Sequence, residues 1–167
     1  MPTRSRTRSR STTAPAGRGR RNESEPVTML RSDHERVKDL FRQFESADGG
    51  ERSRLFEEIS RELQVHTKLE EEIFYPAVKR LPTDDAKEMV NESVEEHNIV
   101  DFVLESMQRL SPDDETFEAK FSTLRENVEH HIEEEEKQLF KIAGSIEDPE
   151  ALGERMRQRK EQLVMRR

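Results

Sequence analysis

Cysteine is absent from the sequence. Its absence excludes disulfides, zinc fingers, iron–sulfur clusters, thiolate-ligated haem and a cysteine nucleophile. Any metal must therefore be held by His, carboxylate or Tyr side chains. Glycine is scarce, with six residues, and neither GxGxxG nor GxxxxGK[ST] occurs, so nucleotide-phosphate folds have no support.

Hydrophobic residues make up only 31% of the chain, aromatic residues 5% and charged residues 40%. No apolar run approaches the ~20 residues that a membrane-spanning helix needs. Alternating β-branched and aromatic residues are also rare, which argues against an all-β fold. A chain of 167 residues is long enough for one compact domain of ordinary size. We therefore expect a cytoplasmic, non-membrane protein.

The net charge of −8 hides a basic N-terminal segment. Residues 1–25 contain seven Arg against two Glu, a net charge of +5, so the remaining 142 residues carry −13. This Arg/Ser-rich segment has almost nothing to bury, and we predict that it is disordered. It has no apolar stretch typical of a secretory signal. Contact with nucleic acid or another polyanion is one interpretation, but Arg/Ser runs supply charge without specificity, which favours a solvated tail.

After residue 25 the apolar residues recur with helical spacing. The first helix should end at Asp48-Gly49-Gly50 and the second at Pro82, and Gly144 should cap the fourth. Ser111-Pro112 is expected to supply the N-cap and first residue of the fourth helix. Long amphipathic helices with short connections predict an all-α, up-and-down antiparallel four-helix bundle over residues 26–145. A short helix over 146–167, beginning near Asp148-Pro149, should pack on the bundle or extend from it.

Four of the five histidines lie on the apolar stripes, one in each predicted long helix. The polar residues on these stripes are His34, then His66 and Glu70, then His97, then His131 and Glu135. Steps of three and four residues point all of them into the bundle core. The two halves of the chain repeat the pattern: a lone His is followed 63 residues later by another, and a His-x3-Glu pair recurs after 65 residues.

This repeated set predicts a metal site. A His and a Glu four residues apart share one helix face, about 5–6 Å apart, and can hold one metal or two adjacent metals. Buried imidazoles and carboxylates without a cation would cost several kcal/mol each. In the fourth helix His130 competes with His131, because Glu134 also follows it by four residues. The repeat selects His131, and His130 lies ~100° round the helix.

Residues 26–145 resemble the hemerythrin-like HHE cation-binding domain. The family motif H…HxxxE…H…HxxxE is matched by the six residues of the repeat, and Asp33-His34 and Phe74-Tyr75-Pro76 are also similar to the family. The resemblance implies a four-helix bundle around a non-haem di-iron centre. It implies two iron ions, bridged by carboxylates and by an oxo or hydroxo group. Dioxygen, peroxide or iron would be the small ligands.

One position departs from the oxygen-carrying members of the family. Where they have a second His, four residues after the His of the third helix, this chain has Asp101. With four imidazoles, two bridging carboxylates and a bridging oxygen, two of twelve iron positions stay open. Asp101, on the same face as His97, and Tyr75 are candidates to fill one. Tyr75 follows His66 by nine residues, ~180° away on an ideal helix, so it needs a local distortion to reach the site.

The leading functional hypothesis is a di-iron protein that reacts with or senses oxygen species or iron, with catalase-like peroxide decomposition or ferroxidase-like oxidation as candidate activities. A structural or regulatory interaction module is an alternative, as is a mononuclear zinc or manganese site. The acidic runs beside Glu70 and Glu135 are expected to form mostly a solvated face that draws cations towards the site.

Overall fold

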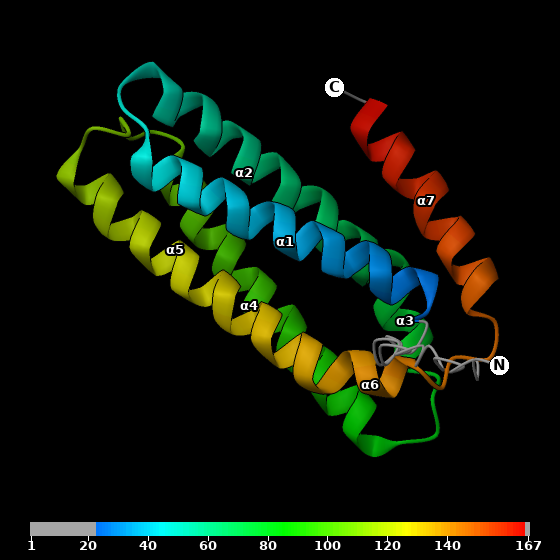
Figure 1. The fold of residues 1–167 in the computed structure, drawn as a ribbon. Helices are drawn as coiled ribbons and strands as arrows, with labels where there is room; N and C mark the ends of the chain where they lie inside the picture. Colours follow the sequence, from blue (N-terminus) through cyan, green and yellow to red (C-terminus); the bar gives the residue numbers. More distant parts are fainter. Residues whose placement is uncertain (1–22, 166–167) are drawn as a thin grey trace, which may run out of the picture.

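The computed structural model describes residues 23–165, and these form helices and turns without a β-strand. Four long helices make the body: α1 (Glu25–Ser46), α2 (Gly50–Leu69), α4 (Asp84–Met107) and α5 (Glu115–Glu134). Successive long helices run in opposite directions, α1 beside α2 and α4 beside α5 (Figure 1). The predicted up-and-down four-helix bundle is confirmed.

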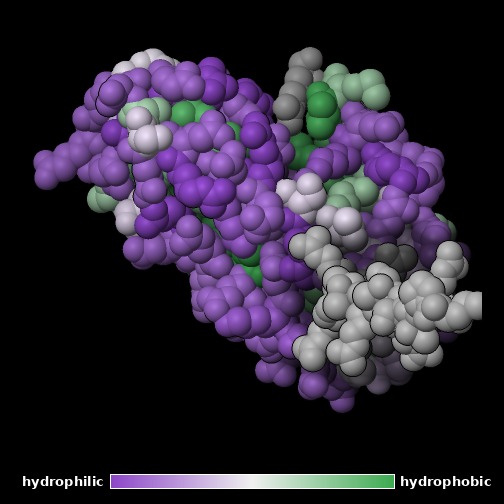
Figure 2. Space-filling view, in the orientation of Figure 1, coloured by the Kyte–Doolittle hydropathy of each residue, from purple (hydrophilic) through white to green (hydrophobic). Residues whose placement is uncertain are grey.

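Two apolar clusters fill the bundle, one towards each end. The first lies near the α1–α2 turn and includes Phe41, Phe44, Phe117 and Phe121. The second includes Leu30, Phe74, Val90 and Phe140, with residues from the C-terminal helix. The surface facing the viewer is hydrophilic over most of its area, with hydrophobic residues visible mainly between the helices (Figure 2). The buried polar residues of the candidate site lie between these clusters.

Each half of the bundle contains a π-helical turn that begins at the Glu of its His-x3-Glu pair. The first is η1 (Glu70–Phe74), which continues into α3 (Tyr75–Val78). The second is η2 (Glu135–Leu139), which continues into α6 (Phe140–Ala143). The backbone N–H groups of Tyr75 and Phe140 donate to the carbonyls five residues earlier. A turn of this kind re-aims the residues that follow it, and such turns occur frequently at functional sites.

The helix ends agree with the sequence at most positions. Gly49, with φ of 51°, makes the α1–α2 turn, and Gly144 is the C-cap of α6. The prediction that Ser111-Pro112 begins the fourth helix is wrong, because α5 begins at Glu115. Asp114 is its N-cap, since its carboxylate accepts the Thr116 N–H. The Ser111 carbonyl instead accepts the Asp114 N–H and closes a turn.

The C-terminal helix α7 (Pro149–Met165) packs against α1, α2 and η1, beside the α1–α2 pair (Figure 1). It buries Leu152 and Met156 in the second apolar cluster. Glu25, the last residue of the predicted disordered tail, is the first residue of α1 and pairs with Arg157 of α7. The rest of that prediction, for residues 1–22, lies outside the described residues. Within residues 23–165 no helix combines the length and apolar character of a membrane span.

Candidate metal centre

The six residues of the repeated pattern converge in the middle of the bundle. Their relative exposures are 1% for His34, 5% for His66, 0% for Glu70, 2% for His97, 5% for His131 and 2% for Glu135. They come from α1, α2, η1, α4, α5 and η2, so every long helix contributes. The sequence prediction that these side chains point inward agrees with the structure.

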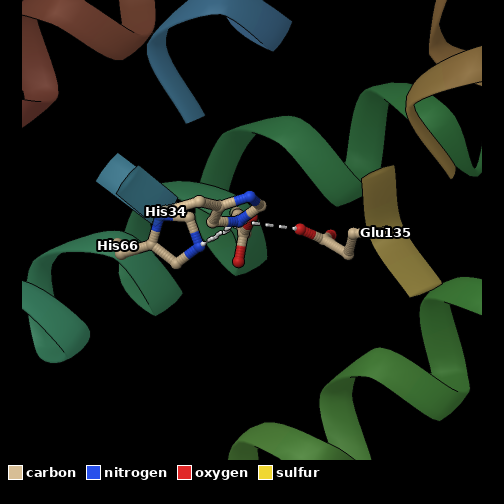
Figure 3. A group of neighbouring side chains, drawn as sticks. His34, His66 and Glu135 are labelled. Carbon is tan, nitrogen blue, oxygen red and sulfur yellow. Dashed lines mark hydrogen bonds and ion pairs between the residues drawn. The ribbon is translucent and has the colours of Figure 1, made fainter. Parts of the chain in front are cut away.

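His34 and His66, the first His pair, face each other through their Nε2 atoms at 3.2 Å. The Nε2 of His66 lies 3.2 Å from Glu70 Oε1, and the Nε2 of His34 lies 3.4 Å from Glu135 Oε2. Figure 3 shows His34, His66 and Glu135 pointing towards one another. One ligand atom from each of these four residues lies within 4.8 Å of the others.

His97 and His131, the second His pair, repeat this arrangement. Their Nε2 atoms are also 3.2 Å apart. The second carboxylate oxygen of Glu70 lies 3.3 Å from His97 Nε2, and Glu135 Oε2 lies 3.8 Å from His131 Nε2. Each of the two carboxylates therefore contacts both His pairs. Glu70 belongs to both of the buried groups of side chains that could hold a metal ion.

The outward-facing nitrogens of the imidazoles meet a further group of acids. The Nδ1 atom of His34 lies 3.0 Å from Glu136, that of His97 lies 2.8 Å from Glu71, and that of His131 lies 2.7 Å from Glu96. His66 faces Asp33 at a longer distance of 3.8 Å. Metal-binding imidazoles are typically oriented in this way, with the far N–H donating to a carboxylate that fixes the ring and its tautomer.

Tyr75 reaches the centre although an ideal α-helix would turn it away. The η1 turn brings residue 75 back over Glu70, so that the Tyr75 hydroxyl lies 2.9 Å from Glu135 Oε1, 3.3 Å from Glu70 Oε2 and 3.3 Å from His97 Nε2. Its ring stacks on His97, with ring centroids 5.6 Å apart. In the other half Phe140 takes the matching place and stacks on His34, also at 5.6 Å. The local helix distortion that Tyr75 needs to reach the site is thus the π turn that precedes Pro76.

In the metal-free protein, burial and neighbouring charges shift the pKa values of the buried side chains. Burial opposes a charged imidazole at His66, but Glu70, Asp33 and Glu135 outweigh it and raise the pKa of His66 to about 10. Burial also opposes a charged carboxylate at Glu70, yet His66 and His97 hold the pKa of Glu70 well below its usual value. Burial together with Glu70 and Glu135 raises the pKa of Tyr75 well above its usual value. The hydrogen bond from His131 lowers the pKa of Glu96.

A cavity of about 20 Å³ lies against the histidines, on the side of the first apolar cluster. Five apolar side chains line it, namely Val37, Leu63, Val100, Val128 and Ile132. A space of this size holds about one water-sized molecule. A larger groove of about 510 Å³ runs along the surface between α1 and α5, and Ile132 lines both the groove and the cavity.

Two candidates from the sequence lie away from the centre. The His130 side chain is 63% exposed, whereas His131 is buried. The prediction that His131 rather than His130 points inward agrees with this difference in exposure. Asp101 is exposed on α4 and belongs to none of the groups of clustered metal-binding side chains among residues 23–165. Burial raises the pKa of Asp101, with Glu71 and Glu105 adding to the shift while His97 opposes it.

Four acids that face the far nitrogens, three of them within hydrogen-bond distance, were not identified from the sequence. Glu71 and Glu136 belong to the acidic runs that were expected to be mostly solvated, yet they contact His97 and His34. A signal for them was present in the repeat: each directly follows the Glu of a His-x3-Glu pair. Asp33 and Glu96 likewise directly precede the lone histidines.

Comparison with known proteins matches residues 25–143 to the hemerythrin HHE cation-binding domain. The chain belongs to this family. The crystal structure of a hemerythrin HHE cation-binding domain-containing protein from Mycobacterium kansasii is similar, with a TM-score of 0.71 and 27% identity, over 81% of this chain and 85% of that one. A DNA nickase from Nostoc sp. (strain PCC 7120) is 28% identical over 114 residues. That match covers 67% of this chain but only 31% of the nickase, so this domain corresponds to about a third of that protein.

The residues present fit a pair of metal ions. Glu70 Oε1 and Glu135 Oε2 are buried without a hydrogen-bond partner, so each retains an acceptor position that a cation would satisfy. The Nε2 atoms of each His pair lie 3.2 Å apart, so both nitrogens of a pair could serve one ion. Imidazole and carboxylate suit iron, manganese and zinc, and exclude metals that need thiolates.

Proposed function

We propose that this hemerythrin-family bundle holds two iron ions and reacts with or senses small oxygen species, with peroxide decomposition or ferrous-iron oxidation as its chemistry. The observation that carries the proposal is the duplicated site. Each His pair has the same 3.2 Å spacing, and Glu70 and Glu135 each face both pairs. A single ion would use one pair and leave the other buried and uncompensated.

His34 and His66, with Glu70 and Glu135, would hold one ion, and His97 and His131 with the same carboxylates would hold the other. Bound iron would supply one-electron redox chemistry to a reactant beside it. Glu136, Glu71 and Glu96 orient three of the imidazoles, so the ligands are positioned before an ion arrives.

The cavity selects for small reactants. Its volume of about 20 Å³ and its apolar lining favour a molecule of the size of dioxygen or hydrogen peroxide over an organic substrate. Decomposition of two hydrogen peroxide molecules to two waters and one dioxygen needs no other oxidant or reductant. Tyr75 holds its proton, because its pKa is raised, and its hydroxyl donates to Glu135. The same hydroxyl lies 3.3 Å from Glu70 Oε2 and 3.3 Å from His97 Nε2, so it carries a proton beside the shared carboxylates.

The test is metal analysis followed by activity. Purified chain is reconstituted anaerobically with ferrous iron, freed of excess and analysed for iron; the expected content is about two ions per chain. Peroxide is then added, and its consumption and the evolved dioxygen are followed. One ion or fewer per chain after full reconstitution would overturn the two-ion site. Two ions without either peroxide consumption or ferrous oxidation would leave the centre intact and refute the reaction.

A further inference from the structure

The four imidazoles differ in what holds their far nitrogen. Three have a carboxylate oxygen 2.7–3.0 Å from Nδ1. At His66 the gap to Asp33 Oδ2 is 3.8 Å, too long for a hydrogen bond. Both of these atoms are buried and have no hydrogen-bond partner. His66 is therefore the one imidazole of the centre whose orienting contact is not made.

The other oxygen of Asp33 is taken by Lys160. The Nζ atom of Lys160 pairs with Asp33 Oδ1, and the two side chains are 28% and 11% exposed. Lys160 is on α7, beyond residues 25–143 that match the family. In the second half, Glu96 takes the place of Asp33. Its ion-pair partners among residues 23–165 are His130 and His131, with no Lys or Arg.

The Lys160–Asp33 ion pair should lower the affinity for an ion beside His66. A carboxylate that accepts the far N–H of a ligand imidazole fixes the ring and makes its metal-binding nitrogen more basic. A carboxylate shared with an ammonium group is a weaker acceptor, and its charge, which would attract the ion, is neutralised. Both effects lower metal affinity, and they act on the first His pair alone.

We propose that Lys160 of α7 is a positioning residue that weakens metal binding at the first His pair, by drawing the Asp33 carboxylate away from His66. The inference rests on the proposed two-ion site. It makes the two ions inequivalent: the ion at His34 and His66 exchanges first, and the ion at His97 and His131 is retained. Residues outside the family domain thus act on one of its two metal positions.

The experiment follows metal release. The chain is loaded anaerobically with ferrous iron, and an excess of a coloured ferrous chelator is added, so that release is read as absorbance against time. Wild type should release its two ions in two phases. Lys160→Met frees Asp33 to close on His66, and the faster phase should slow by about tenfold, the lower end of the 10–100-fold range for such contacts. Lys160→Arg keeps the charge and should behave like wild type.

Arg159→Met is the matched control. Arg159 is adjacent on α7, carries the same charge and pairs with Glu72 at 2.6 and 3.0 Å, and it contacts none of the imidazoles. Its loss should loosen α7 as much as the loss of Lys160 does, yet leave both release phases unchanged. Equal slowing in both variants would overturn the proposal, because the cause would then be docking of α7.

A double-mutant cycle separates the effect of the Lys160–Asp33 contact from the effect of α7 docking. Asp33→Asn removes the carboxylate, should speed release of the first ion, and should abolish the effect of adding Lys160→Met. Unchanged or faster release in Lys160→Met alone would refute the role of Lys160, while iron content stays at two per chain. A wild-type content of one ion or fewer would instead refute the proposed function, and this inference with it.

Discussion

The two halves of the bundle carry the same metal-binding groups in different surroundings. Each has a His pair with Nε2 atoms 3.2 Å apart, a His-x3-Glu pair and a π turn that begins at the Glu of that pair. The two halves differ in the groups that surround these metal-binding side chains. The second His pair has the Tyr75 hydroxyl beside His97, whereas the first His pair has the Phe140 ring beside His34. Around the first His pair, the carboxylates that face the far nitrogens are paired with Arg31 and Lys160.

This comparison shows where a repeat can diverge. The inward groups must keep their positions to enclose an ion, because a lost partner leaves a buried charge uncompensated. Among the surrounding groups, the carboxylates of Glu71, Glu96 and Glu136 are partly solvated, so changes there cost less and can tune each ion separately.

The shared carboxylates should matter to both halves. Glu70→Ala removes a group that faces His66 at 3.2 Å and His97 at 3.3 Å, so the iron content should fall from about two ions per chain to below one. The measurement is elemental analysis after reconstitution. Glu133→Ala, at an exposed residue two positions before Glu135, is the control and should retain both ions. A Glu70→Ala protein that retains two ions would show that the halves do not share this residue.

Metal binding should displace a proton from the first half. Since the pKa of His66 is raised to about 10 in the metal-free protein, this imidazole is charged at pH 7 and must lose its proton to bind an ion. Apparent affinity should then rise by about tenfold per pH unit for each proton released, over pH 6–9. Calorimetry in buffers of different ionisation enthalpy counts the protons. An affinity that does not change over this range would contradict the expectation.

The same pKa shift sets the sign of a stability effect. A pKa raised from 6.5 to about 10 on folding means that His66 stabilises the metal-free protein fully below pH 6.5 and loses this contribution as the pH rises through 10. The thermal midpoint of metal-free protein should therefore fall between pH 7 and pH 10. Metal-loaded protein is the control and should show a smaller change, because its imidazoles are already neutral ligands.

Tyr75→Phe makes the two halves alike at this position. It removes the hydroxyl that donates to Glu135 at 2.9 Å, and the loss should destabilise metal-free protein by about 1–3 kcal/mol in denaturant titration. The variant also tests Tyr75 as a ligand: a phenolate on ferric iron absorbs visible light, and that band would vanish in Tyr75→Phe. An unchanged visible spectrum together with the loss of stability would identify Tyr75 as a hydrogen-bond donor only.

Asp101→Asn should have the smallest effect. Asp101 is exposed and lies outside the clustered side chains among residues 23–165, so iron content and metal release should not change. Elemental analysis and chelator competition would check this. A loss of one ion in Asp101→Asn would instead show that α4 moves to bring this carboxylate to the metal, beyond what its present position allows.

Apolar periodicity and the half-repeat were enough to predict the helices, the bundle and the six inward residues, because each signal is local and recurs. The choice of His131 over His130 also agrees with the burial of one and exposure of the other. The start of α5 was missed, since Ser111-Pro112 has the composition of a helix start but forms a turn, and Asp114 caps the helix instead.

The residue pattern alone is therefore enough to specify which residues enter the core and which donor types they bring. Which groups surround them depends on the tertiary packing. Tyr75 reaches the centre because of a π turn, and no pattern in the sequence predicted the hydrogen bonds of that turn. Glu71, Glu96 and Glu136 meet imidazoles on other helices, and Lys160 meets Asp33 across 127 positions of sequence. Such contacts depend on how helices pack side by side, and helical periodicity specifies only the face that each helix turns inward.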